Sequence, residues 1–445
     1  MSRRGTRVRR LSGRHARRPR RGIAGAALPL SLCLLAVMGL LTAATASFLR
    51  HPQRVIAQTP PDTDALARLG TDVAAANPPR ASASPTSSSP SPSATVITAS
   101  RAAIPSDQRR AVKQRSVETD GSPKALAVAP DGSVAVLSMT SREILVVGPD
   151  GSRRASVPTT VTPSRLGEPR WSQAVKGAPV DGAFTPDGGH LWVSNYAMSG
   201  PGFTRPGTDE CRSGSGLDGS FLYRVSTRTW TVDAVVAVGA VPKDVRVSPD
   251  GASVLVTTWC SGELTVVDAA TAEVRGSLPL GSHPRGIAVS PDSRTAYVTL
   301  TGGRDVVVVD LAGVAEWKGV RGRWSGLGEG PRQVVLTRDG RRAYVTCLGA
   351  GTVLTVDVAT GRVLATARPG REPRTAVLSG DGSALFVVNY ESSTITRLRA
   401  SDLEVVETVA TQRHTIALGY AAAASQLWVG QVDGTLDVYG DEVRR

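Results

Sequence analysis

The sequence predicts an all-β fold: a seven-bladed β-propeller, preceded by an N-terminal transmembrane or signal segment and a disordered linker rich in Pro and Ser. Three observations support this prediction. One unit recurs along most of the chain, its clearest copies begin 42 residues apart, and its apolar runs often alternate with polar residues as strands do. A fixed period of about 40–50 residues is typical of stacked units such as propeller blades.

The repeated unit is clearest between residues 241 and 310. There it consists of Pro, a basic residue, a short apolar strand, Ser-Pro-Asp, a second strand, a polar turn and a third strand that ends in Asp. The first turn is Pro-Asp-Gly in three units and keeps Pro-Asp or Asp-Gly in three more. This chemistry suits a tight connection between antiparallel strands, so we interpret each unit as one sheet. Seven units begin at Pro123, Pro179, Pro242, Pro284, Pro331, Pro373 and, in degraded form, His414.

The formal net charge of +14 at pH 7 lies mostly outside the repeats. Residues 1–48 carry a net charge of +10, residues 49–122 carry +3, and residues 123–445 carry +1. The repeat region therefore lacks the bulk positive charge of a typical polyanion-binding domain, which weighs against nucleic-acid binding.

The N-terminal part divides into three predicted segments ahead of a propeller at residues 111–445. Residues 1–22 are a basic cytoplasmic segment, and residues 23–48 are an uncharged stretch long enough to span a bilayer. Residues 49–110 are a disordered linker. We expect a single-pass protein of the cell membrane with its propeller outside the cytoplasm. Alternatively, residues 44–46 (Ala-Thr-Ala) are part of a signal-peptidase site, and the protein is secreted.

Residues 111–118 are expected to close the ring. The seventh unit has strand-like runs at residues 426–429 and 435–438, and no run for a fourth strand follows them. Residues 111–118 precede the first unit and have no inner strands of their own. We expect them to form the outer strand of the seventh blade, because that pairing removes the open sheet edges.

Five of the seven units have a basic residue directly after the initiating Pro. The order of turns in a blade places this position on the face that also carries the second turns and the links between blades. The innermost strand begins there, so these side chains are expected to ring the mouth of the central channel. They are Lys124, Lys243, Arg285, Arg332 and Arg374.

This ring is a candidate binding site for a small anionic ligand or a protein partner. Several convergent cations suit a carboxylate or a phosphate, which arginine binds with two parallel hydrogen bonds. The alternative is that each cation is solvated or pairs with a nearby acid such as Asp181, Asp244 or Glu372. A second set of candidate residues follows the second strands on the same face. Its members are Asn195, Tyr196, Trp259, Asn389 and Tyr390.

These polar and aromatic residues have two interpretations: aromatic rings beside cations form a recognition surface, or they pack one blade against the next.

Residues 197–219 are a long insertion in blade two that contains Cys211, and Cys260 lies at the equivalent turn of blade three. Adjacent blades and a shared face allow a Cys211–Cys260 disulfide, which would fix the insertion over the channel mouth. The alternative is two free thiols. Cys347 is left unpaired and is expected to be buried.

Four strand sequences carry a resemblance to a known family. They are Tyr297-Val298-Thr299-Leu300, Tyr344-Val345-Thr346-Cys347, Trp192-Val193-Ser194-Asn195 and Phe386-Val387-Val388-Asn389. They resemble the YVTN-repeat β-propellers, the YncE-like group, over about residues 112–440. The resemblance implies the propeller fold, but this family is functionally diverse, so it does not identify a function.

The sequence offers little for catalysis. None of its five histidines has the spacing of zinc ligands, and it contains no Gly-x-Ser-x-Gly motif. We therefore predict no catalytic residue, no metal site and no cofactor, and a non-catalytic binding module at the cell surface. One alternative is an extracytoplasmic lactonase or metal-dependent lyase, with His283 and His414 facing each other across the channel beside a carboxylate. The other is nucleic-acid binding, with an affinity that falls steeply with salt.

Overall fold

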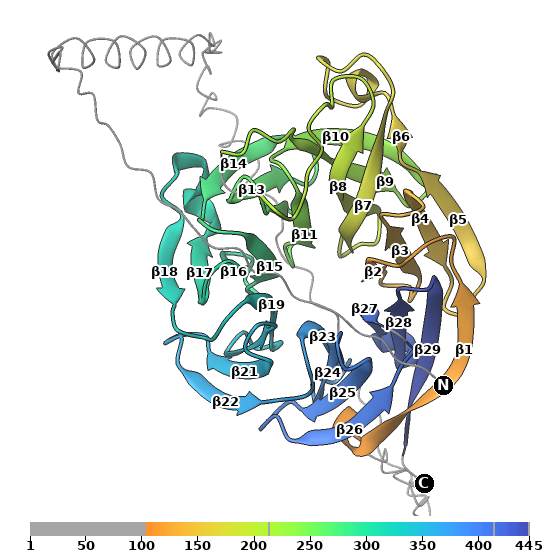
Figure 1. Ribbon diagram of the computed structural model, residues 1–445, viewed down its shortest axis with the longest axis vertical. Helices are drawn as coiled ribbons and strands as arrows, with labels where there is room; N and C mark the ends of the chain where they lie inside the picture. Colours follow the sequence, from red (N-terminus) through yellow and green to blue (C-terminus); the bar gives the residue numbers. More distant parts are fainter. Residues whose placement is uncertain (1–103, 212–213, 413, 444–445) are drawn as a thin grey trace, which may run out of the picture. The chain divides into compact units, whose positions relative to one another are not determined.

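The computed structural model describes residues 104–211, 214–412 and 414–443 (Figure 1). In these ranges the chain forms seven antiparallel sheets, which lie around a central axis as the blades of a closed propeller. The predicted all-β, seven-bladed fold is confirmed. The predicted basic segment and membrane segment lie outside the described residues, as does nearly all of the predicted linker. Within the described ranges, no helix has the length and apolarity needed to cross a bilayer.

Five blades have four strands each, which follow one another in sequence across the sheet. Blade one contains β2 (Ala125–Val128), β3 (Val134–Ser138), β4 (Glu143–Val147) and β5 (Arg153–Pro158). Blade three contains β11 (Pro242–Val247), β12 (Ser253–Thr258), β13 (Glu263–Asp268) and β14 (Val274–Pro279). Blade four contains β15 (Pro284–Val289), β16 (Thr295–Leu300), β17 (Asp305–Asp310) and β18 (Val320–Trp324). Blade five contains β19 (Pro331–Leu336), β20 (Arg342–Cys347), β21 (Thr352–Asp357) and β22 (Val363–Ala367). Blade six contains β23 (Pro373–Leu378), β24 (Ala384–Asn389), β25 (Thr394–Arg399) and β26 (Val405–Ala410).

Burial explains the Val-rich strands. Every residue of β12 is buried, because neighbouring blades cover both faces of this strand, whereas β14 at the outer edge is largely exposed. The turn between β11 and β12 has the predicted chemistry: Gly251 adopts a positive φ of 74°, and Asp250 accepts a hydrogen bond from the backbone N–H of Ala252 at 3.0 Å. The repeats thus place their innermost strands around one axis.

Blade two has five strands: β6 (Thr160–Val161), β7 (Val175–Phe184), β8 (His190–Ser199), β9 (Ser220–Ser226) and β10 (Thr231–Val238). The predicted insertion lies mainly between β8 and β9. The Cys211–Cys260 disulfide is present, with a Cα–Cα distance of 5.7 Å, and it ties this loop to blade three. Cys347 is free and fully buried, as predicted.

Blade seven is closed by the two ends of the folded region. Its strands are β27 (Thr415–Ala421), β28 (Gln426–Gln431), β29 (Thr435–Val443) and β1 (Arg109–Glu118). β1 pairs antiparallel with β29, which confirms that residues 111–118 lie in the outer strand. The seventh unit begins one residue later than predicted, because Thr415 pairs with Gln431 as Pro373 pairs with Asn389. His414 is therefore a link residue.

A buried ion-pair network secures this closure. The Arg397 side chain, on β25, is 1% exposed and donates to Asp441 on β29 at 2.7 Å. Its Nε lies 3.2 Å from Glu407 on β26, and its Nη1 also donates to the backbone carbonyl of Ser106. Ser106 belongs to the short helix η2 (Ser106–Gln108), which directly precedes β1. The network joins blade six to both strands of the closure.

Candidate functional site

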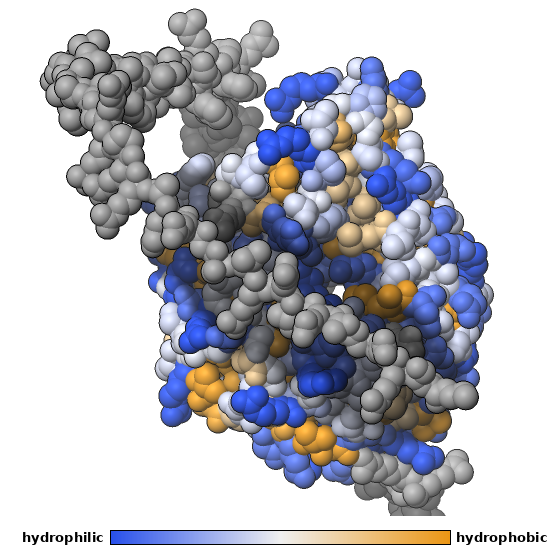
Figure 2. Space-filling model, viewed as in Figure 1, coloured by the Kyte–Doolittle hydropathy of each residue, from blue (hydrophilic) through white to orange (hydrophobic). Residues whose placement is uncertain are grey.

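The residue that follows the first residue of each repeated unit lies at one mouth of the central channel, at or near the start of the innermost strand. These residues are Lys124, Val180, Lys243, Arg285, Arg332, Arg374 and Ile416. In blades three to six the pairing register of the innermost strand shifts directly after its first residue. The basic residue therefore lies at an irregularity of the strand, where regular pairing with the second strand is interrupted. Lys124, Lys243, Arg285 and Arg332 line one cavity of about 440 Å³. Figure 2 shows hydrophilic side chains around the centre of the viewed face.

Lys243 has an acidic partner that the sequence did not indicate. Its ammonium pairs with the carboxylate of Asp209, which belongs to the blade-two loop. The ammonium also lies 4.5 Å from the ring centroid of Tyr196 and 5.3 Å from that of Trp259. The side chain of Lys243 is only 3% exposed, so this pair and the two aromatic rings enclose it.

Burial and the positive charge of Arg285 lower the pKa of Lys243 from 10.5 to about 7, and Asp209 offsets only part of this effect. Lys243 in turn holds the pKa of Asp209 below its ordinary value, although burial opposes this shift. The pair is therefore asymmetric: the carboxylate is stabilised in its charged form, while the enclosed lysine is not.

Arg374 also has an acidic partner, which agrees with the alternative interpretation that the basic residues pair with nearby acids. Its Nη2 donates to the carboxylate of Glu372 at 2.9 Å, and its guanidinium lies 3.4 Å from the ring centroid of Tyr390. Two of the five basic residues at the mouth thus have acidic partners.

The other three form what we call the unpaired triad: Lys124, Arg285 and Arg332. Among the described residues, no acidic side chain lies within 4.0 Å of their charged nitrogens. Burial, and then the charges of Arg285 and Arg332, lower the pKa of Lys124 from 10.5 to about 8. Burial lowers the pKa of Arg332 well below its ordinary value, and Arg285 lowers it further. The triad therefore concentrates positive charge that has no direct ion-pair partner in the described part of the chain, and the longer-range attraction of acids such as Asp209 offsets only part of the effect of burial.

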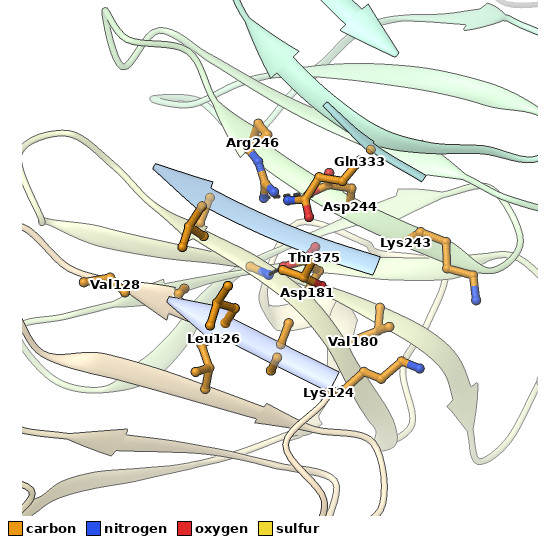
Figure 3. Close-up of a pocket in the computed structure, with 18 of the residues that line it drawn as sticks. Lys124, Leu126, Val128, Val180, Asp181, Lys243, Asp244, Arg246, Gln333 and Thr375 are labelled. Atoms are coloured by element: carbon orange, nitrogen blue, oxygen red, sulfur yellow. Dashed lines mark hydrogen bonds and ion pairs between the residues drawn. The ribbon is translucent and has the colours of Figure 1, made fainter. Parts of the chain in front are cut away.

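A second polar layer lies deeper in the same cavity. It contains Asp181, Asp244 and Arg246, which Figure 3 shows farther inside than the amines of Lys124 and Lys243. Arg246 pairs with Asp244 at 2.6 Å. Burial raises the pKa of Asp181 well above its ordinary value, and the neighbouring Asp244 carboxylate raises it further. Both acids of this layer act on Arg285 by coulombic attraction, but burial outweighs this effect and the pKa of Arg285 remains below its ordinary value.

The sequence did not identify this layer as a site, although its signal was present. The residue directly after the channel-mouth position is polar in blades two, three, five and six, where it is Asp181, Asp244, Gln333 and Thr375, respectively. Asp244 accepts a hydrogen bond from the backbone N–H of Ile287 at 2.8 Å, and Gln333 accepts one from that of Ala376 at 3.0 Å. Each side chain reaches the next blade, so the polar residues at this position join neighbouring strands as well as lining the channel.

Two predicted ligand residues do not reach the mouth. Asn195 and Asn389 are fully buried. The amide of Asn195 donates to the Phe221 carbonyl at 3.0 Å, and that of Asn389 donates to Thr396 at 2.9 Å. Their side chains hold neighbouring strands together inside their own blades. The aromatic residues beside them do border the site.

Trp259 and Tyr390 each stack on a histidine of the following link. The ring centroids of Trp259 and His283 are 4.4 Å apart, and those of Tyr390 and His414 are 4.6 Å apart. His283 also contacts the carbonyl oxygen of Cys211 at 3.0 Å. Among the described residues, no carboxylate lies within 4.0 Å of the ring nitrogens of these two histidines. The same ranges contain no group of three metal-ligating side chains.

Comparison with known proteins supports the fold. No model of a known protein family matches the chain, and no curated protein matches it. Among solved structures 1675 chains match, so the architecture is too common to select a function. One is a chain of hydrazine synthase from Kuenenia stuttgartiensis, which is 18% identical, has a TM-score of 0.58, and covers 74% of this chain and 98% of its own length. At this identity the likeness shows the fold alone.

Proposed function

We propose that the protein is a non-catalytic binding module at the cell surface, anchored by residues 23–48, whose channel mouth holds a small anion or an anionic group of a protein partner. We also assign it to the YVTN-repeat propellers on the strand sequences described above. The observation that carries the binding proposal is the unpaired triad of Lys124, Arg285 and Arg332 around one cavity. Charges removed from water without a partner destabilise a folded protein.

An anion in this cavity removes that unfavourable energy. It supplies the missing negative charge, and the two guanidinium groups offer planar pairs of N–H donors. The cavity of about 440 Å³ limits the ligand to a small molecule or to a single side chain of a partner. In the deeper layer Asp244 pairs with Arg246, and among the described residues neither Asp181 nor Asp244 forms a direct ion pair with the triad, so the ligand is the only direct counter-charge that the proposal assigns to it.

The test is thermal unfolding of the full-length chain with sulfate, phosphate and citrate. Each anion that binds stabilises the folded state by mass action, by about 2.7 kcal/mol at one hundred times its dissociation constant. We expect the variant Arg285→Ala/Arg332→Ala to lose this stabilisation and to unfold at a higher temperature than the parent without anion.

The matched control is Arg362→Ala, which removes an exposed arginine beside the turn between β21 and β22. This variant should keep the full anion response. Equal stabilisation of the parent and the double variant would refute the site, and so would the absence of any shift with all three anions.

A further inference from the structure

Lys124 differs from the four other lysines of the sequence. Lys113, Lys243 and Lys318 each pair with a carboxylate, at Asp437, Asp209 and Glu316, respectively. Lys176 is exposed on β7. Among these five residues, Lys124 alone lines the cavity without an acidic partner in the described part of the chain.

The position of Lys124 in the ring gives its amine a defined target. It extends from the start of blade one, whereas Arg285 and Arg332 extend from the adjacent blades four and five. In a ring of seven, blades four and five are the two that lie opposite blade one (Figure 1). A ligand whose anionic group binds the two arginines therefore has its remaining atoms between them and the amine of Lys124.

The amine of Lys124 is also available as a nucleophile. Only a neutral amine attacks a carbonyl group, and lysines desolvated beside other cations are activated in this way. With a pKa of about 8, about a quarter of Lys124 is neutral at pH 7.5, against about one part in a thousand for a lysine of ordinary pKa. Lys243 has a lower pKa, but its side chain is enclosed and paired with Asp209.

We propose that Lys124 captures small anions that carry an aldehyde or ketone, such as 2-oxo acids and phosphorylated aldehydes, by forming an imine with their carbonyl carbon. The amine nitrogen bonds to the carbonyl carbon, the carbonyl oxygen leaves as water with the two amine hydrogens, and a C=N bond remains. Arg285 and Arg332 hold the anionic group during this step. The reaction is reversible and needs no oxidant or reductant. It rests on the proposed anion site and specifies the ligand class of that site.

The test uses pyridoxal 5′-phosphate as the probe on the full-length chain at pH 7.5. Borohydride reduces any imine to a stable amine, and peptide mass spectrometry then measures the adduct at each lysine. We expect about tenfold more adduct at Lys124 than at the exposed Lys176, despite its lower exposure. Pyridoxal, which has the same aldehyde and no phosphate, should lose this preference, and excess sulfate should suppress it.

Two variants separate this proposal from the anion site itself. Lys124→Arg should keep its thermal stabilisation by sulfate and lose the adduct, whereas Arg285→Ala/Arg332→Ala should lose both. If sulfate stabilises the parent but Lys124 is labelled no more than Lys176, the anion site stands and the imine proposal is overturned. If sulfate has no effect on stability or labelling, both proposals fail.

Discussion

The carboxylate of Asp209 pairs with the ammonium of Lys243, and this contact joins a loop of blade two to the innermost strand of blade three. The two partners differ in environment, since the Asp209 side chain is 63% exposed and that of Lys243 only 3%. The blade-two loop thus supplies one carboxylate, that of Asp209, to the basic residues at the channel mouth. The positive charge that remains for a ligand is concentrated on the unpaired triad.

We predict that Asp209→Asn destabilises the protein by about 1–2 kcal/mol below pH 6, which is less than the loss of a fully buried pair because Asp209 is exposed. The effect should vanish above pH 9. Lys243 has a folded pKa of about 7, below its unfolded value, so its buried charge is unfavourable at low pH and disappears as pH rises through that pKa. Urea unfolding of the parent and of Asp209→Asn at pH 5.5 and at pH 9 measures the loss of stability at low pH and its absence at high pH. Glu210→Gln, at an exposed position of the same loop, is the control, and a loss of stability in Asp209→Asn that does not depend on pH would contradict the assignment.

Anion affinity should fall as pH rises through 8. In the protein without an anion, the pKa of Lys124 is about 8, so this side chain loses its positive charge above that pH. An anion binds better to the charged form, so binding above pH 8 requires Lys124 to take up a proton. We expect a decrease of up to about tenfold per pH unit in sulfate affinity between pH 8 and 9, measured by calorimetry. Sulfate keeps its charge over this range. Lys124→Met should bind more weakly and lose this part of the pH dependence, and an unchanged pH profile in that variant would exclude Lys124 from the site.

Reducing the Cys211–Cys260 disulfide should release the blade-two loop. The bond joins residues 49 positions apart, so the chain-entropy model predicts a loss of up to about 4 kcal/mol in stability. Asp209 is two residues from Cys211, so Lys243 should also become more reactive toward amine reagents after reduction. Mass spectrometry of labelled peptides measures this change, with Lys176 as the control lysine. Unchanged reactivity of Lys243 would show that the loop keeps its position without the bond.

Arg397→Met should destabilise the closed ring by about 3–5 kcal/mol, because it leaves the buried Asp441 carboxylate without its partner. Chemical denaturation measures the loss. Arg399→Ala, which removes a more exposed arginine of the same strand, should cost less than about 1 kcal/mol. The double variant Arg397→Met/Asp441→Leu should recover part of the loss. Similar losses for Arg397→Met and Arg399→Ala would mean that the network does not secure the closure.

The regular parts of this structure could be predicted from the sequence because they repeat. The Pro-basic pattern placed Lys124, Arg285 and Arg332 at one mouth, and the order of turns placed Cys211 near Cys260. The unmatched run at residues 111–118 predicted the closing strand for a similar reason: the number of strands in a blade is fixed.

Two kinds of contact could not be predicted from the sequence: contacts made by a loop that does not repeat, and contacts that depend on which way a side chain points from its strand. Asp209 lies in an insertion with no counterpart in the other units, so no repeat indicates its partner Lys243. A pattern of residue types also does not show whether a polar side chain points out of a blade or into it. Asn195 and Asn389 stand next to aromatic residues of the mouth, yet their amides bond within their own blades.

The pairing of β1 with β29 has a consequence for the order of assembly. β1 is the first strand of the folded region to be synthesised, and its partner is the last. Contacts between the two ends of such a long region form late, because the loop between them must close first. For a chain that emerges gradually from the ribosome, β1 cannot begin to pair before Thr435 is synthesised, and its full pairing also needs Val443. A paired β1 therefore requires that synthesis has passed β29, and a chain that ends before β29 leaves β1 exposed to proteases and chaperones.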